Sequence, residues 1–306
     1  MECSVVICTH NPRKDYLQRV LDGLQVQTLS RERWELLVID NASRESLSQA
    51  WDLSWHPHAR ILHESQLGLT YARLRGIKES AGEWLVFVDD DNLLAVDYLE
   101  QALRIAVEWP TLGAYGASIS AEFEAPPPNW ALPYLEGLAI RELDRDYWAN
   151  LGGWSLATPC GAGLCVRRAV GLNYLQKANA SEFRKMLGRS GLNLGAGEDS
   201  DLAECAVDMG LGTGRFAALK LVHLIPRNRM TADYIVRLYA GLAGSQEMLA
   251  SLRPKSGLAA KRGWEGELRF WFNFFKAKGI QKRIVWASHQ ARKRSRRLMA
   301  ALPPAS

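Results

Sequence analysis

The chain has 306 residues, of which 47% are hydrophobic and 23% charged, as in a folded protein of one large or two small domains. No stretch is long and apolar enough to span a bilayer, and the amino terminus lacks a secretory signal, so a cytoplasmic location is expected. The five cysteines have irregular spacings that match neither a disulfide framework nor a zinc site, which predicts reduced, mostly buried thiols.

The net charge of +5 conceals an asymmetry along the chain. Residues 251–306 contain 14 Lys and Arg and only two acids, a net charge of +12, whereas the first 250 residues contain 24 bases and 31 acids, a net charge of −7. A mildly acidic body therefore carries a strongly basic tail. Such a tail indicates an anionic partner, either a membrane surface or a polyanion.

The first 120 residues alternate strand and helix patterns at the spacing of βαβ units. Strands are expected at residues 4–9, 34–40, 60–63 and 83–89, and helices at residues 15–27, 67–79 and 96–108. The strands are nearly continuous apolar runs, which is typical of a parallel sheet covered on both faces.

The pattern changes after residue 120. A proline-rich loop is expected at 125–130, a tight turn at Gly161-Ala162-Gly163, a strand at 219–223, and helices at 172–187, 201–210 and 231–252. We therefore predict a catalytic domain over 1–250, divided into a nucleotide-binding half (1–120) and an acceptor-binding half (121–250). A basic, aromatic helical extension follows at 251–306.

Three consecutive carboxylates, Asp89, Asp90 and Asp91, follow the apolar strand that ends at Val88. Three like charges at a buried strand end are costly unless a cation offsets them. In an extended segment Asp89 and Asp91 would point to one side, where their oxygens could bind Mg²⁺ or Mn²⁺ and, through it, a diphosphate. The alternative is a solvated acidic turn.

Other polar residues also follow strands at what should be the same edge. Asp40 could accept a hydrogen bond from a nucleotide base, or could simply form an Asx-turn. Thr9, His10 and Asn11 could bind a nucleotide or form a structural turn. Arg73 and Arg75 should point to different faces of their helix, one toward a diphosphate and the other to solvent.

Two further candidates lie in the second half of the chain. Glu198 and Asp199 follow a glycine pair, and a carboxylate there could take a proton from an attacking hydroxyl, although acids are also favoured at any helix start. His223 lies at the end of an expected strand, where a neutral imidazole could complete the coordination of a metal.

The order of these segments resembles a family 2 glycosyltransferase with a GT-A fold, over roughly residues 3–240. The resemblance rests on Cys8-Thr9-His10-Asn11, Val38-Ile39-Asp40-Asn41, the stretch 68–76, Phe87-Val88-Asp89-Asp90-Asp91-Asn92 and the stretch 197–202. One departure is Leu74, which stands where the family often has Asn. The expected fold is a mostly parallel, Rossmann-like sheet flanked by helices, with the basic helical extension added.

The resemblance implies a role for each matching residue. Nucleotide contacts would come from Thr9, His10, Asn11, Asp40, Arg73, Asp89 and Asp90, with Asp40 on the base and Arg73 near the diphosphate. Asp89 and Asp91 match the DxD motif and would bind Mn²⁺ or Mg²⁺ together with His223. Asp199 matches the base and Glu198 would position it. The stretch 159–168 resembles the segment that shapes the acceptor side.

The implied activity is a metal-dependent, inverting transfer of a sugar from a nucleotide-diphosphate sugar to an acceptor hydroxyl, in polysaccharide or glycolipid synthesis. A UDP-sugar is favoured as donor, and the acceptor would be a saccharide or a lipid-linked molecule. No specific nucleic acid partner is expected.

The tail has two interpretations. Its aromatic and basic residues suit an interfacial helix on the cytoplasmic face of a membrane, or a helical hairpin whose aromatics pack on the catalytic domain.

Two other functions of the chain stay open. One is a nucleotidyltransferase, although the stretch 9–13 lacks a glycine-rich phosphate loop; the other is a non-catalytic polyanion-binding protein that acts through the tail.

Overall fold

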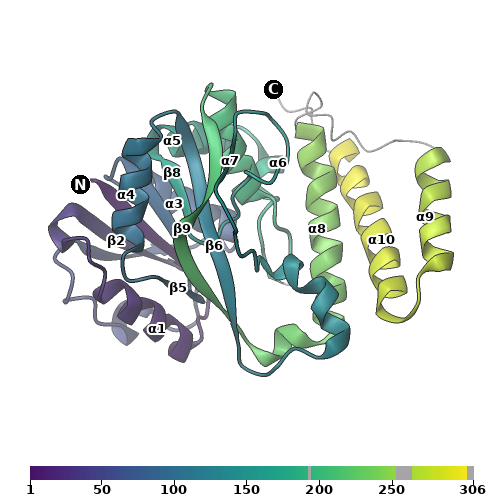
Figure 1. Ribbon diagram of the computed structural model, residues 1–306, viewed down its shortest axis with the longest axis horizontal. Helices are drawn as coiled ribbons and strands as arrows, with labels where there is room; N and C mark the ends of the chain where they lie inside the picture. The colour runs from purple at the N-terminus through teal and green to yellow at the C-terminus, as the bar shows by residue number, and fades with distance from the viewer. Residues whose placement is uncertain (192–193, 253–263, 302–306) are drawn as a thin grey trace.

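The computed structural model describes residues 1–191, 194–252 and 264–301, and within them one nine-stranded sheet forms the centre of the molecule (Figure 1). Its strands run in the order β3-β2-β1-β4-β8-β6-β9-β5, and β7 pairs with β9. Their bounds are β1 Cys3–Thr9, β2 Trp34–Asn41, β3 Ala59–Glu64, β4 Trp84–Asp89, β5 Asn92–Leu94, β6 Leu112–Phe123, β7 Tyr147–Ala149, β8 Leu164–Arg167 and β9 Gly212–Ile225.

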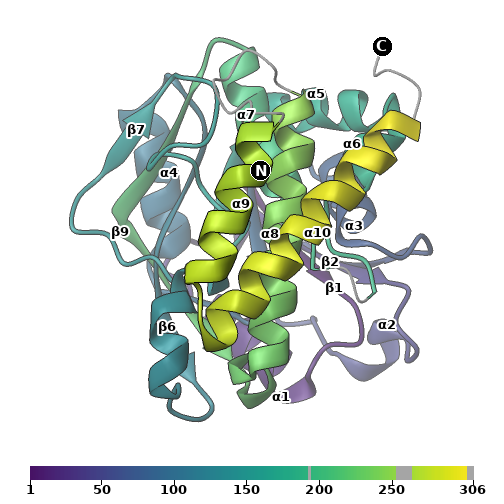
Figure 2. The same ribbon diagram turned by 90° about the vertical axis from the view of Figure 1, so that its right-hand side faces the viewer.

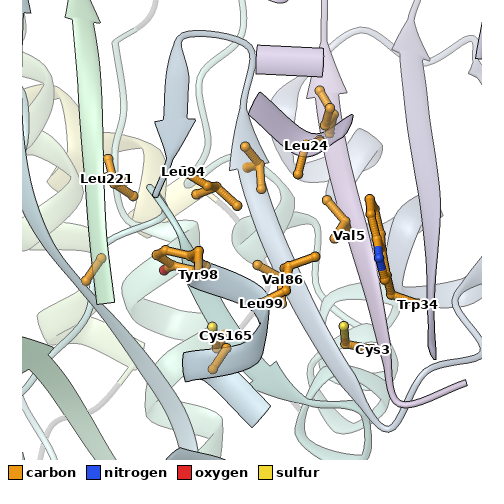
Figure 3. Packing of buried hydrophobic residues seen from close by; sticks show 14 of the residues in the cluster. Cys3, Val5, Leu24, Trp34, Val86, Leu94, Tyr98, Leu99, Cys165 and Leu221 are labelled. Carbon is orange, nitrogen blue, oxygen red and sulfur yellow. The ribbon is translucent and has the colours of Figure 1, made fainter. Parts of the chain in front are cut away.

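The four strands predicted in the first half are confirmed as a parallel set. Strands β1 and β2 are buried at every position because helices cover both faces of the sheet. On one face α1 (Lys14–Gln25) and α4 (Tyr98–Glu108) pack on the strands, and Figure 3 shows Leu24 and Tyr98 among the residues of this core. On the other face lie α3 (Leu69–Glu79), α5 (Arg168–Asn179) and α7 (Glu198–Asp208).

The second half of the sheet is mixed, and part of it was not predicted. Strand β8 runs antiparallel to β4 and β6, β6 runs parallel to β9, and β5 pairs antiparallel with β9. The sequence of β6 is rich in Gly and Ala, which have low strand propensity, so its local pattern does not reveal a strand. Because β6 spans residue 120, the proposed halves share this sheet.

Several predicted elements differ from the observed ones. The helix expected at 172–187 is interrupted after Asn179, and a separate short helix α6 (Glu182–Lys185) begins after Ser181, whose hydroxyl caps it. Helix α7 begins at Glu198, three residues earlier than expected. The loop expected at 125–130 leads into a 3₁₀ helix, η2 (Asn129–Leu138). The remaining short helices are η1 (Arg31–Arg33), α2 (Leu47–Ala50) and η3 (Arg227–Met230).

Three helices lie together beside the sheet at the carboxyl end of the described chain: α8 (Ala232–Leu252), α9 (Trp264–Lys276) and α10 (Gly279–Ala301). Helix α10 packs on α8, and α9 packs on α10 as the outermost of the three (Figures 1 and 2). Among the described residues, no helix is both long and apolar enough to cross a bilayer.

Candidate active site

The carboxyl ends of three parallel strands bring the first set of candidate residues together. Thr9 of β1 is in register with Asp40 of β2, and Cys8 of β1 is in register with Asp89 of β4. Ligands of open α/β sheets bind at this edge. The sheet therefore gathers residues that are far apart in the sequence at one crevice.

The three aspartates have three different environments. The chain turns at Asp90 and Asp91 between β4 and β5, so the extended geometry expected for residues 89–91 is wrong. Asp89 is partly exposed, with a carboxylate oxygen 3.4 Å from Nη2 of Arg73. Asp90 accepts a short hydrogen bond from the hydroxyl of Thr9, and Asp91 is buried beside His223 and Arg229.

The buried carboxylate of Asp91 already has a cationic partner. Nη2 of Arg229 donates to Oδ2 of Asp91 at 2.8 Å, and Nε2 of His223 lies 3.4 Å from the same oxygen. Burial alone would raise the pKa of Asp91, but the charge of His223 in its protonated form and the charge of Arg229 outweigh it and hold that pKa below its ordinary value. Asp91 is therefore an ionised carboxylate in a cationic environment.

The hydrogen bonds of His223 define its tautomer. Its Nδ1 lies 2.9 Å from the carbonyl oxygen of Leu138, which can only accept, so Nδ1 carries the proton. In the neutral imidazole Nε2 has a free lone pair, to which Nη1 of Arg229, 3.0 Å away, donates. A backbone carbonyl that fixes the imidazole in this way is the usual support of a metal-binding histidine.

Asp90 differs from its neighbour. Burial, together with the adjacent negative charge of Asp91, raises the pKa of Asp90 to about 7. Its bond from Thr9 ties the end of β4 to the end of β1. We conclude that Asp90 holds the two strand ends together.

Arg73 connects the two acidic motifs. It is buried, donates from Nη1 to Oε1 of Glu198 at 2.7 Å and lies 3.4 Å from Asp89. A Cβ atom on Gly161 would lie 2.4 Å from Nη2 of Arg73, so any larger residue there would force the buried guanidinium to shift. Arg75, as expected for the other helix face, is half-exposed and pairs with Glu79.

The second acidic motif begins helix α7. Glu198 is buried against Arg73, and burial raises its pKa to about 7 even though Arg73 opposes the shift. Asp199 accepts from the backbone N–H of Gly161 through Oδ2 and from that of Ser200 through Oδ1, both at 2.7 Å. These two bonds orient the carboxylate.

The remaining nucleotide candidates lie in the loops after β1 and β2. Asp40 is buried and its Oδ1 accepts from the N–H of Ser43, three residues on, at 3.1 Å, so its side chain stabilises the turn after β2. Nδ1 of His10 lies 2.7 Å from the carbonyl of Asn41. Asn11, in the left-handed region at φ 48°, exchanges hydrogen bonds with Ser43 and Arg44.

A cavity of about 1230 Å³ joins most of these residues. Its lining includes Thr9, His10, Arg73, Asp89, Asp90, Asp91, Glu198, Asp199, His223 and Arg229. Asp40 instead lines a second hollow of about 290 Å³, together with Ser43, Arg44, Ile61 and His63. The large cavity could hold a ligand with charged groups, and the small hollow lies beside the ends of β2 and β3.

Sequence reasoning missed Arg229 and the part played by Gly161. Arg229 lies in η3, directly after β9, and reaches Asp91 across 138 positions of sequence. The only sequence signal was a pair of arginines following His223. Gly161 was recognised as part of a turn, but its contact with Arg73 depends on tertiary packing.

The residues at this corner fit a divalent cation in part. Asp91 offers an anionic oxygen and His223 a ring nitrogen, both common metal donors. Within residues 1–191, 194–252 and 264–301, no group of three or more His, Cys, Asp or Glu side chains is already arranged around a common centre. A bound ion would therefore need further ligands from a substrate or water.

The family model described as glycosyl transferase family 2 matches residues 4–167, from β1 through β8. The chain belongs to glycosyl transferase family 2. The match includes Thr9, Asp40, Arg73 and the three aspartates, whereas Asp199 and His223 lie beyond it.

Curated relatives of this family share part of the chain. An uncharacterised glycosyltransferase of Haemophilus influenzae is 28% identical over 109 residues, which is 36% of each chain. The putative glycosyltransferase EpsH of Bacillus subtilis is 26% identical over 123 residues, 40% of this chain and 34% of EpsH. The putative teichuronic acid biosynthesis glycosyltransferase TuaG of the same species is 28% identical over 109 residues, 34% of this chain and 42% of TuaG. The matched segment thus spans about a third of the first two relatives.

Solved structures confirm the fold class. Residues 1–349 of S. aureus TarS in complex with UDP match with a TM-score of 0.53 and 13% identity, covering 97% of this chain and 92% of that one. The complex of the same TarS fragment with UDP-GlcNAc matches with a TM-score of 0.51 and 12% identity, at the same coverage. The mixed α/β, GT-A-like architecture expected from the sequence is therefore correct.

Proposed function

We propose that the chain is a metal-dependent, inverting glycosyltransferase that moves a sugar from a UDP-sugar to an acceptor hydroxyl. The observation that carries this proposal is the single cavity that the DxD segment, Arg73, His223 and the Glu198-Asp199 pair all line. Membership of family 2 and glycosyltransferase relatives such as TuaG support it.

The donor would occupy the edge formed by β1, β2 and β4. Asp40 and the small hollow beside it would accept the base, with Thr9, His10 and Asn11 around the nucleoside. The TarS complexes with UDP and UDP-GlcNAc support uridine as the base. Arg73, however, is already paired with two carboxylates, so we assign it to holding both motifs in place rather than to carrying the diphosphate alone.

Asp91 and His223 would hold Mn²⁺ or Mg²⁺, with Asp89 nearby at the open side of the site. When bound, this ion would act as a Lewis acid that offsets the charge developing on the diphosphate. We infer that Arg229 moves away from Asp91 when the metal enters, because both cations compete for the same carboxylate oxygen.

Asp199 would act as the general base. It takes the proton of the acceptor hydroxyl, the oxygen attacks the anomeric carbon, and the bond from that carbon to the diphosphate breaks on the opposite face. A single displacement inverts the configuration. The two backbone N–H groups on Asp199 leave lone pairs free on both of its oxygens, and Glu198, fixed by Arg73, orients the start of α7.

The acceptor would enter through the part of the cavity beyond Asp199, in polysaccharide or glycolipid synthesis. Relatives named for glycosyltransfer and, in one case, for teichuronic acid biosynthesis support this class. A division of the catalytic domain at residue 120 and a cytoplasmic location are also part of the proposal.

A thermal-shift panel of UDP-, GDP- and dTDP-sugars, with and without Mn²⁺, tests the donor. The proposal predicts the largest shift with a UDP-sugar and Mn²⁺ together. With a competent acceptor, release of UDP and an inverted linkage seen by NMR would support transfer. Release of inorganic pyrophosphate would instead indicate a nucleotidyltransferase.

A further inference from the structure

Helix α9 carries an uncovered apolar stripe along its outer side. Its side chains are 43% to 74% exposed and belong to Trp264, Leu268, Trp271, Phe272 and Phe275. Along the chain these residues follow one another at intervals of 4, 3, 1 and 3 positions, which places all five on one face of the helix. We call these five residues the α9 stripe.

The stripe is not an unfilled contact with the rest of the molecule. The opposite face of α9 already packs on α10: Phe270 stacks on His289 with ring centres 3.7 Å apart, and Phe274 lies 5.6 Å from Trp286. Helix α10 in turn packs on α8, which places α9 outermost (Figure 2). The aromatic side chains on this face of α9 thus pack on α10, whereas the hairpin interpretation expected them to pack on the catalytic domain.

Basic side chains border the stripe. Nζ of Lys276 lies 5.9 Å from the ring centre of Phe272. Nζ of Lys282 lies 4.6 Å from that of Phe274, whose ring is 5.8 Å from the rings of Trp271 and Phe275 in the stripe. Arg269 and Lys278 are also exposed there. Glu267 is paired with His289 and Lys293 of α10, so its charge is offset within the helix pair.

We propose that the α9 stripe docks the protein on an anionic lipid bilayer, with the stripe among the acyl chains and the lysines at the headgroups. Tryptophan and phenylalanine beside lysine suit this interface, since the long lysine stems reach the headgroups while the rings stay in the apolar layer. If the α9 stripe paired with that of a second copy of the chain, the basic side chains of the two copies would face and repel each other. A nucleic acid is a poorer match, because its phosphates need cations and the centre of the α9 stripe is apolar.

The cavity of the proposed active site extends to the inner side of helix α9, opposite the stripe. The cavity that begins at Thr9 and Asp89 is also lined by Phe270 and Asn273 of α9. A bilayer at the stripe would bring a lipid-linked acceptor to that end of the cavity. The delivery of a lipid-linked acceptor rests on the proposed function, whereas the docking of α9 on a bilayer does not.

Vesicle flotation of the full chain tests the proposal. Vesicles of phosphatidylcholine alone are compared with vesicles that also contain phosphatidylglycerol, at low and high salt. We expect the protein to float with the anionic vesicles and to float less at high salt. A wild-type chain that stays at the bottom with anionic vesicles overturns the proposal, and salt-sensitive RNA binding in its place would identify the tail as a polyanion site.

Two pairs of variants identify the surface. F272S/F275S should abolish flotation. The control V26S/V107S removes exposed apolar side chains at the end of α1 and in α4 and should float normally. K276Q/K282Q should weaken binding to anionic vesicles roughly 25-fold, because each lysine near such a surface contributes a factor of about five. The matched K14Q/K78Q control should have no effect. If F272S/F275S and K276Q/K282Q both float as the wild type does, the assignment of the docking surface to α9 is wrong.

A parallel measurement separates this proposal from the proposed enzyme. UDP binding in the presence of Mn²⁺ should be the same in F272S/F275S and the wild type, which also shows that the variant is folded. Normal UDP binding without flotation of the wild type removes only the docking proposal. Flotation without any nucleotide binding removes only the enzymatic one.

Discussion

Arg229 donates a hydrogen bond of 2.8 Å to Asp91, the carboxylate that the DxD pattern assigns to a metal. The same guanidinium contacts Nε2 of His223 at 3.0 Å. A side-chain cation thus occupies the position where the sequence predicts a divalent one. The pair explains how a buried carboxylate stays ionised before any metal binds, and it sets up a competition between two cations.

Replacing Arg229 should strengthen metal binding in the absence of nucleotide. In R229M the carboxylate of Asp91 loses its cation and is left beside His223 alone, so Mn²⁺ should bind about tenfold more tightly, a change of ~1.4 kcal/mol. Free Mn²⁺ measured by electron paramagnetic resonance gives the affinity. R227M, in the exposed neighbour of the same turn, should not change it. An unchanged or weaker affinity in R229M would show that the two cations do not compete.

The variant D199N should retain UDP binding and lose transfer. Removing a general base costs at least ~10²-fold in rate. Isothermal titration with UDP and Mn²⁺ measures the first property, and product formation from a UDP-sugar measures the second. D208N makes the same chemical change at the exposed end of α7 and should transfer normally. Transfer by D199N at the wild-type rate would mean that another group is the base.

The buried Glu198 should make stability depend on pH. Its pKa is raised from 4.5 to about 7, so folding favours the protonated form. That stabilisation is complete below pH 4.5 and is lost as the pH rises to about 7, by up to about 3 kcal/mol at ~1.4 kcal/mol per pKa unit. Thermal unfolding of E198Q should show a smaller decline over this range. E182Q, at an exposed site, should keep the wild-type slope, and an equal slope in E198Q would contradict the assignment.

Gly161 and Gly23 should respond to alanine with opposite signs. In G161A the new methyl group meets Arg73, which must shift, so we expect a loss of about 1–3 kcal/mol in unfolding free energy and weaker transfer. Gly23 lies in α1, and in G23A the methyl group meets only the carbonyl oxygen of Leu94 in β5, at 4.0 Å, so stability should rise by about 0.5–1 kcal/mol. Denaturant titration measures both. A neutral G161A would indicate that Arg73 is not tightly held.

Much of the first half of the fold could be predicted because its signals are local. The apolar runs of β1, β2 and β4 are buried on both faces, and each ends in a polar residue at the sheet edge. Strand β6 escaped prediction because its Gly and Ala content hides a strand that only its neighbours β8 and β9 stabilise.

In the candidate site, too, some residues could be predicted from the local sequence and others only from the tertiary packing. Asp89, Asp90 and Asp91 were identifiable because three adjacent acids after an apolar strand are unusual in themselves. Their partners were not, since Arg229 and the carbonyl of Leu138 reach the site only through the packing of β9, η3 and η2. The α9 stripe was visible in composition, but which of its aromatics face outward depends on the contact with α10.

The most direct test of the account is a crystal structure of the chain with UDP and Mn²⁺, with the metal located by anomalous scattering. The account predicts an anomalous peak within coordination distance of Asp91 and Nε2 of His223, bridged to the diphosphate, with Arg229 displaced from Asp91. UDP bound in the crevice with no peak there, and with Arg229 still on Asp91, would contradict it.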